Sequence, residues 1–226
     1  MNEQIDFEKL RRDVIPKKYL KKGGWRGPSV DELIAQNKRM RRENLTDELT
    51  RLPNIRAMNK MLVGLETAWE RSKTKTDGDR ILEGTFLAVD LTALHQVNDL
   101  FGHSVGDTYL KTVAEVLSTD IRKNDRVFRN GEKSDEFTVH MPSITDKDEL
   151  EGVMNRIDKK ISEKANELQK NLPGINFSVS YVAVRYGIKM KPSNACKRAH
   201  DEMGLAKGKK AHDTGQRGEN IGRIII

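Results

Sequence analysis

The order of two hydrophobic periodicities along the chain constrains its fold more than any other feature. Short apolar runs bounded by polar residues, typical of buried strands, alternate with segments whose apolar residues recur at helical spacing. The predicted strands are 85–91, 126–129, 136–141, 175–184 and 221–226, and the predicted helices are 53–70, one opening at 145, 193–207 and one running from Gly106. Strands alternating with helices, plus one hairpin, predict an α/β sandwich with a mixed sheet of about five strands flanked by helices.

The N-terminal part of the chain differs from this pattern. Basic clusters in the first 42 residues (RR, KK, KK, KRMRR) supply much of the net charge of +7, and KKGGWRGPS is typical of a linker. Ser29 and Glu32 form a capping-box pattern that predicts the start of a helix. We therefore expect a basic helical extension over 1–45 and a separate domain over 46–226. The helix could be a packing strut or a dimer stalk, and both interpretations stay open.

Composition excludes some function classes. No run of 18 apolar residues exists, so no membrane span is predicted, and the N-terminus lacks the apolar stretch of a signal peptide. Cys196 is the single cysteine, which precludes an internal disulfide and fits the reducing cytoplasm. A pI of about 9.4 suits a phosphate-bearing partner, but the basic clusters contain no interleaved aromatic residues. Nucleic acid is therefore not expected as a partner, and a solvated basic surface is the simpler alternative.

Three carboxylates are candidate metal ligands. Asp90 ends a predicted buried strand, and Asp135 and Glu136 lie at a hairpin turn that enters another strand. Mg²⁺ prefers carboxylate oxygens, and carboxylates at a strand end and an adjacent hairpin can converge on one ion. The alternative is structural: Asp90 caps the following turn, and the other two are ordinary hairpin polarity. Spacing alone leaves both interpretations open.

A second polar segment follows the first predicted strand. Residues 98–107 (NDLFGHSVGD) contain two glycines and several side chains able to form hydrogen bonds. An aspartate accepts from paired N–H groups, while an asparagine offers both a donor and an acceptor, so together they could read the edge of guanine. The same residues could equally form a capped loop before a helix.

Five segments follow one another at the spacing of one known family's motifs. Residues 47–56 (DELTRLPNIR) resemble D-x-L-T-x-L-x-N-x-R, and residues 90–107 resemble D-x-D-x-F-K-x-x-N-D-x-x-G-H-x-x-G-D. Arg122 and Asp125 resemble an R-x-x-D motif, and Arg129 resembles a later arginine. Residues 135–137 match D-E-F, and residues 199–207 (AHDEMGLAK) resemble A-D-x-A-M-Y-x-A-K. From 47 to about 210 the chain is thus similar to the GGDEF family of bacterial diguanylate cyclases, whereas residues 1–40 are not covered.

The resemblance implies a palm-like nucleotide-cyclase fold and a specific reaction. Members condense two GTP molecules into cyclic di-GMP, release pyrophosphate, act as dimers and need Mg²⁺ or Mn²⁺. Carried over by position, the catalytic residues would be Asp90, Asp135 and Glu136, and the metal ligands would be these three with the Leu91 carbonyl. The implied substrate-binding residues are Leu49, Asn98, Asp107, Gly131 and Lys207, of which Asn98 and Asp107 would read guanine and Lys207 would contact the terminal phosphates. Arg122 and Asp125 would form the product-binding inhibitory site.

The signature turn departs from the family pattern. Residues 129–137 read RNGEKSDEF, so two extra residues lie in the turn and Ser134 replaces a glycine that tolerates more backbone shapes. Because side chains in a hairpin alternate with period two, this even insertion keeps Asp135 facing as before. Lys133 could touch a phosphate or block it.

Supporting positions depart as well. Thr92 replaces the family's second aspartate, and Leu94 and His95 replace its Phe-Lys pair. Val182 replaces a strand glycine, and Ala211 replaces a late basic residue. Two hypotheses follow. The chain is a diguanylate cyclase, or it is a catalytically degenerate GGDEF domain that binds GTP or cyclic di-GMP as a sensor. The retained carboxylates favour the first, and the altered turn favours the second.

Overall fold

The computed structural model divides the chain into two units, 1–43 and 44–226. In the first unit it describes only six positions, and in the second it describes 45–73, 82–131, 134–169, 178–214 and 222–226. The predicted capping box is formed: the Ser29 N–H donates to the Glu32 carboxylate at 2.5 Å, and the Glu32 N–H donates to the Ser29 hydroxyl at 3.1 Å. Most of the predicted basic extension lies outside the described residues, so its role stays a prediction.

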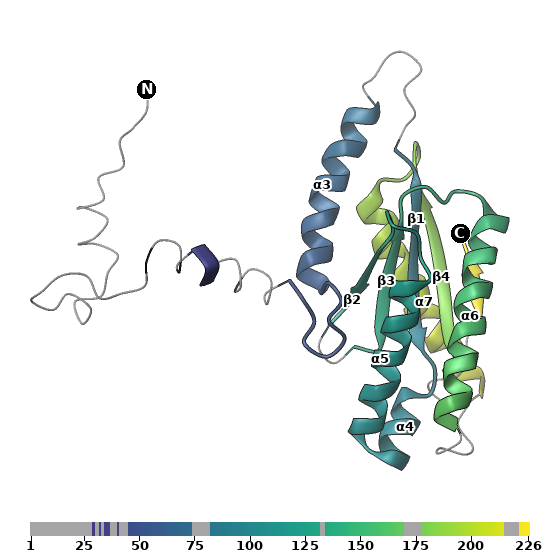
Figure 1. Ribbon diagram of the computed structural model, residues 1–226. Coiled ribbons are helices and arrows are strands. Elements are labelled where there is room, and N and C mark those ends of the chain that lie inside the picture. The colour runs from purple at the N-terminus through teal and green to yellow at the C-terminus, as the bar shows by residue number, and fades with distance from the viewer. Residues whose placement is uncertain are drawn as a thin grey trace, which may run out of the picture. The chain divides into compact units, whose positions relative to one another are not determined.

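The second unit is built on a five-stranded sheet in the order β2-β3-β1-β4-β5 (Figure 1). The strands are β1 Gly84–Leu91, β2 Arg126–Arg129, β3 Glu136–Met141, β4 Val179–Tyr186 and β5 Arg223–Ile225. β1 lies at the centre and is antiparallel to both β3 and β4, while β4 and β5 are parallel. The mixed sheet predicted from the sequence is confirmed.

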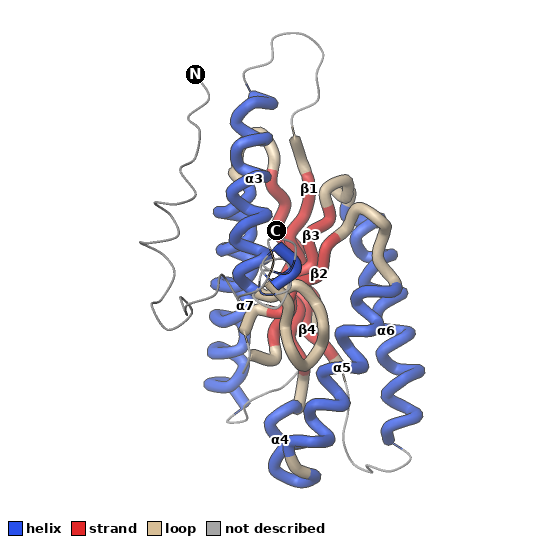
Figure 2. The backbone as a smooth tube through the Cα atoms, turned by 60° about the vertical axis from the view of Figure 1, so that its left-hand side comes forward, coloured by secondary structure: helices blue, strands red, loops and turns tan. Residues whose placement is uncertain are grey.

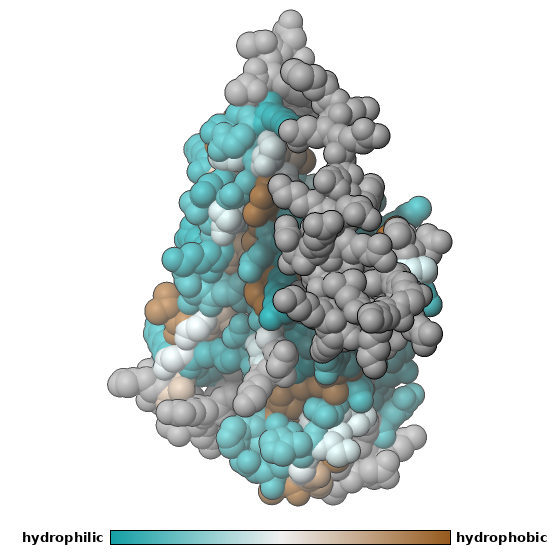
Figure 3. Space-filling view, turned by 90° about the vertical axis from the view of Figure 1, so that its left-hand side faces the viewer, coloured by the Kyte–Doolittle hydropathy of each residue, from teal (hydrophilic) through white to brown (hydrophobic). Residues whose placement is uncertain are grey.

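Helices cover both faces of this sheet (Figure 2). α3 Ile55–Lys73 and α7 Pro192–Thr214 pack on one face, and α5 His103–Thr119 and α6 Lys147–Gln169 on the other, while α4 Leu94–Phe101 follows the end of β1. Among the described residues, no helix is both long and apolar enough to cross a membrane. On the side that Figure 3 shows, hydrophilic residues cover most of the visible described surface, and apolar residues form small separate patches.

Burial on both faces explains the apolar run of β1. Leu87 and Val89 pack towards α5 and α6, and Phe86 and Ala88 pack towards α3 and α7, since successive side chains alternate across a strand. Asp90 continues the second set, so its carboxylate lies buried on the α7 face. β4 is buried at every position except Arg185 for the same reason. Asp90 therefore places a carboxyl group at a position where the alternation along β1 predicts an apolar side chain.

A buried histidine on the same face should make folding sensitive to acid. His140 is 4% exposed, stacks on Phe86 at 4.8 Å between ring centres, and its Nε2 lies 2.9 Å from the Tyr186 hydroxyl. Burial, and then the nearby Arg126, lower the pKa of His140 from 6.5 to about 4. The unfolded chain takes up this proton first, so the stability from neutral His140 is complete above about pH 6.5 and is lost as the pH falls towards 4.

We expect this one group to cost about 2 kcal/mol of unfolding free energy between about pH 7 and about pH 5. His140→Phe keeps the stacked ring and removes the proton site, so the variant should lose less stability over that interval than the wild type. Urea unfolding of both proteins at the two pH values measures the difference. An equal loss in both would show that His140 does not contribute.

Candidate active site

Two neighbouring strands bring the three candidate carboxylates together. Asp90 on β1 is the register partner of Glu136, the first residue of β3, and Asp135 immediately precedes it. One oxygen from each of the three carboxylates lies within 4.8 Å of the others. The Leu91 N–H donates to the Asp135 carbonyl at 3.2 Å, which ties the end of β1 to the turn. The convergence expected from the sequence is present, while the role of these groups as metal ligands stays a prediction.

The electrostatics of this cluster favour a bound cation. Burial and then the negative charge of Asp135 raise the pKa of Asp90 to about 7, against the opposing effect of Lys207. The Lys207 ammonium donates to Asp90 Oδ1 at 2.5 Å. Crowded oxygen-only donors of this kind suit a hard divalent ion such as Mg²⁺ or Mn²⁺. The residues present therefore fit the metal that the resemblance implies.

His200 joins the cluster, although its residue type is not part of the family pattern. Its Nδ1 lies 3.4 Å from Glu136 Oε2, and its Nε2 lies 2.9 Å from Thr138 Oγ1. Glu136 and Thr138 are two positions apart on β3 and so share one face. The hydrogen bond with His200 lowers the pKa of Glu136 despite its burial. His200 and Lys207 lie about two turns apart on α7, a spacing that could have placed both on one face from the sequence alone.

The altered signature turn holds its shape without the missing glycine. The Ser134 N–H donates to the Gly131 carbonyl, and the Ser134 hydroxyl accepts from the Glu136 N–H, both at 3.1 Å. Ser134 does not have a positive φ, so a serine meets no left-handed backbone strain at this position of the longer turn. Residues 132–133 lie outside the described residues, so the alternatives for Lys133 stay open.

A buried ion pair anchors the turn to the start of the domain. Arg129 Nη1 lies 2.9 and 3.1 Å from the two carboxylate oxygens of Asp47, 82 residues earlier in the chain. The same guanidinium donates through Nε and Nη2 to the Ser134 carbonyl at 3.3 and 3.2 Å. Both members of the pair are buried, at 2% and 5% exposure. Both residues lie in segments that resemble the family motifs, but their spacing along the chain carries no signal of this positioning role.

The predicted base-reading residues lie where α4 meets α5. Asn98 Oδ1 is buried and has no hydrogen-bond partner among the described residues. A Cβ added to Gly106 would lie 2.0 Å from this oxygen, so a glycine is required there for the asparagine to pack as it does. Asp107 is the next residue of α5 and is partly buried. An unsatisfied buried acceptor is costly unless a ligand donates to it, which fits a base-binding role.

The remaining predicted residues have partners of their own. Leu49 packs against the core beneath α5 and α6, and Gly131 lies in the signature turn. The Arg122 guanidinium forms an ion pair with Glu149, and the Arg122 backbone N–H donates to Asp125 Oδ2 at 2.9 Å. Burial raises the pKa of Asp125, although three arginines oppose the shift. The inhibitory-site assignment of Arg122 and Asp125 stays a prediction.

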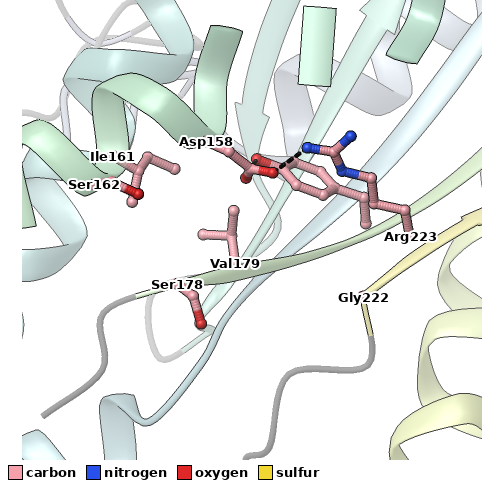
Figure 4. Close-up of a pocket in the computed structure, with 8 residues that line it drawn as sticks. Asp158, Ile161, Ser162, Ser178, Val179, Gly222 and Arg223 are labelled. Carbon is pink, nitrogen blue, oxygen red and sulfur yellow. Dashed lines mark hydrogen bonds and ion pairs between the residues drawn. The ribbon is translucent and has the colours of Figure 1, made fainter. Parts of the chain in front are cut away.

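A separate cavity of about 260 Å³ opens between α6 and the start of β4 and β5 (Figure 4). The Tyr181 hydroxyl donates to Asp158 Oδ1 at 2.7 Å, and Arg223 forms an ion pair with the same carboxylate. Tyr181 belongs to the α5–α6 side of the sheet, opposite to the carboxylate cluster. None of the predicted site residues lines this cavity, and its charged groups already pair with one another.

Comparisons with known proteins agree with this geometry. Diguanylate cyclase DgcP of Pseudomonas aeruginosa is 34% identical over 105 residues, which cover 46% of this chain and 14% of DgcP. The response regulator PleD of Caulobacter vibrioides is 29% identical over 164 residues, which cover 72% of this chain and 34% of PleD. The chain thus spans about a third or less of the length of these curated relatives.

A solved structure shares the fold. The coiled coil and GGDEF domain of DgcB from Caulobacter crescentus, in complex with c-di-GMP, superposes with a TM-score of 0.63 at 18% identity, covering 87% of this chain and 93% of that one. Residues 44–213 match the family described as diguanylate cyclase, GGDEF domain. Because that match covers most of the 226 residues, the chain belongs to the GGDEF family of diguanylate cyclases.

Proposed function

We propose that the protein is a diguanylate cyclase that condenses two GTP molecules into cyclic di-GMP, with Mg²⁺ or Mn²⁺ and as a homodimer. The observation that supports this most is the approach of Asp90, Asp135 and Glu136 to within 4.8 Å of one another despite the altered turn. A location in the cytoplasm is part of the same proposal.

In this proposal each subunit binds one GTP, and the two nucleotides face each other across the dimer. The 3′-oxygen of one GTP forms a bond to the α-phosphorus of the other as the bond to pyrophosphate breaks, and the hydroxyl proton passes to Glu136 or to water. Repeating the step from the other side closes the ring and releases a second pyrophosphate. A metal ion bound here would neutralise charge that develops on the phosphate.

The chain's own residues position and balance charge in this reaction. Asp90 and Asp135, with the Leu91 carbonyl, are assigned to hold the ion, and Glu136 is assigned to assist at the ion or at the attacking hydroxyl. His200 holds Glu136 from the side of α7. Positioning of reactants and electrostatic stabilisation supply most of the rate enhancement in phosphoryl transfer.

A second candidate function is a degenerate domain that binds nucleotide without turnover. It is favoured by Thr92, whose buried hydroxyl has no hydrogen-bond partner among the described residues and replaces a family carboxylate. Incubation with GTP and Mg²⁺, followed by mass spectrometry of the products, distinguishes the two. Cyclic di-GMP with two pyrophosphates supports the cyclase, whereas bound but unchanged GTP supports the sensor.

We expect GTP to bind more tightly than ATP. Adenine lacks the N1–H and N2 donors from which Asp107 would accept hydrogen bonds. Each buried polar group left unpaired in the ATP complex costs about 1–3 kcal/mol of binding free energy. Gly106→Ala should weaken the preference, because the new Cβ would displace Asn98. Gly152→Ala is the matched control, since an added Cβ there meets open space within α6. Calorimetry showing equal ATP and GTP affinity in the wild type would remove the base-reading assignment.

Cyclic di-GMP should bind at Arg122 independently of the metal cluster. The arginine offers a fork of donors to a phosphate or a guanine edge, although Glu149 competes for it. Arg122→Ala should therefore abolish tight cyclic di-GMP binding, while Asp90→Asn should leave it intact. Titration of the wild type and both variants with cyclic di-GMP measures this. Identical weak binding by the wild type and Arg122→Ala would mean that Arg122 and Asp125 are only surface charge.

A further inference from the structure

Helix α7 places a lysine on the carboxylate that is central to the proposed metal site. Lys207 Nζ lies 2.5 Å from Asp90 Oδ1, and the side chains are 29% and 4% exposed. Asp135 and Glu136 add their negative charge to the attraction. In this arrangement the ammonium already supplies the cation that the crowded carboxylates require.

A divalent ion and this ammonium cannot share Asp90 without strong repulsion. A ligand distance near 2.1 Å would bring the ion into the space beside the Lys207 contact. Like charges at such short range in a partly buried site repel strongly, since little water screens them. The ion pair between Lys207 and Asp90 must therefore open when the ion binds.

An ion that arrives alone breaks this pair and leaves Lys207 without its hydrogen-bonded partner Asp90. An ion that arrives with a triphosphate brings phosphate oxygens beside the carboxylates, and these oxygens can accept the displaced ammonium. We propose that Lys207 makes the cluster select a metal–triphosphate complex over the free metal ion. The ammonium stays on Asp90 until phosphate oxygens replace this carboxylate as its partner. This inference rests on the proposed function.

The proposal predicts effects of opposite sign for one substitution. Lys207→Gln removes the competing charge, so free Mn²⁺ should bind about tenfold more tightly than to the wild type. The same variant lacks the phosphate partner, so the Mn²⁺ complex of an α,β-methylene GTP analogue should bind about tenfold more weakly. Lys209→Gln changes the net charge equally from an exposed position on α7 and should alter neither affinity.

Free Mn²⁺ is counted by electron paramagnetic resonance on the full chain at about pH 8. Affinity for the analogue complex is measured by calorimetry. Equal or weaker Mn²⁺ binding by Lys207→Gln would overturn the inference and leave the cyclase proposal standing. If Asp90→Asn binds Mn²⁺ as tightly as the wild type, or if no protein binds it, the metal site itself is wrong and both proposals fail.

Discussion

Asp90→Asn is expected to reduce the rate of cyclic di-GMP formation at saturating Mg²⁺ by about a thousandfold or more. A loss of this size is expected when a metal ion no longer stabilises the charge of the transition state by several kcal/mol. The amide keeps the size of the side chain but supplies less charge to the ion, and it leaves Lys207 without its anionic partner. Release of pyrophosphate from GTP measures the rate. Folding stability should change little, because the substitution also removes a buried charge crowded by Asp135.

Asp158→Asn is the matched control for this prediction. Asp158 accepts from the Tyr181 hydroxyl and pairs with Arg223 on the opposite face of the sheet. Its substitution should cost stability and preserve turnover, the reverse of the result at Asp90. Retained activity in Asp90→Asn, or equal loss of activity in both variants, would contradict the assignment of the site.

Asp47→Ala is expected to lower the free energy of unfolding by about 3–5 kcal/mol, because it removes the anionic partner of the buried Arg129 charge. Asp47 also accepts hydrogen bonds from the backbone N–H and the hydroxyl of Thr50, at 2.7 and 2.6 Å, so its loss removes two further part-buried hydrogen bonds. Urea unfolding measures the change. A double-mutant cycle with Arg129→Leu should show that the two single losses overlap.

Glu149→Ala provides the comparison for that ion pair. Arg122 and Glu149 are 49% and 36% exposed in their side chains, so breaking their pair should cost less than about 1 kcal/mol. A loss at Asp47 no greater than the loss at Glu149 would show that the buried pair does not anchor the turn.

The sheet and the cluster could be predicted because their signals are local. The apolar run of β1 ends at Asp90, and the even insertion in the turn fixes the face of Asp135 by the period of a strand. Hydrophobic periodicity also placed the flanking helices, because burial on one face repeats at helical spacing.

The supporting contacts could not be predicted because they join segments far apart in the chain. His200 reaches Thr138 from 62 residues away, and Arg129 reaches Asp47 across 82. The tolerance of Ser134 depends on the backbone path of a longer turn, which composition does not specify. The hydrogen bonds around that turn, rather than a glycine, hold Asp135 and Glu136 in place.

The most direct measurement of the proposed site is a crystal structure with Mn²⁺ and the α,β-methylene GTP analogue, using the anomalous signal of manganese to locate the ion. The account predicts a peak coordinated by Asp90 and Asp135, with the analogue's phosphates beside Lys207 and its guanine beside Asn98 and Asp107. A peak remote from Asp90, or a nucleotide bound away from the end of β1, would contradict it.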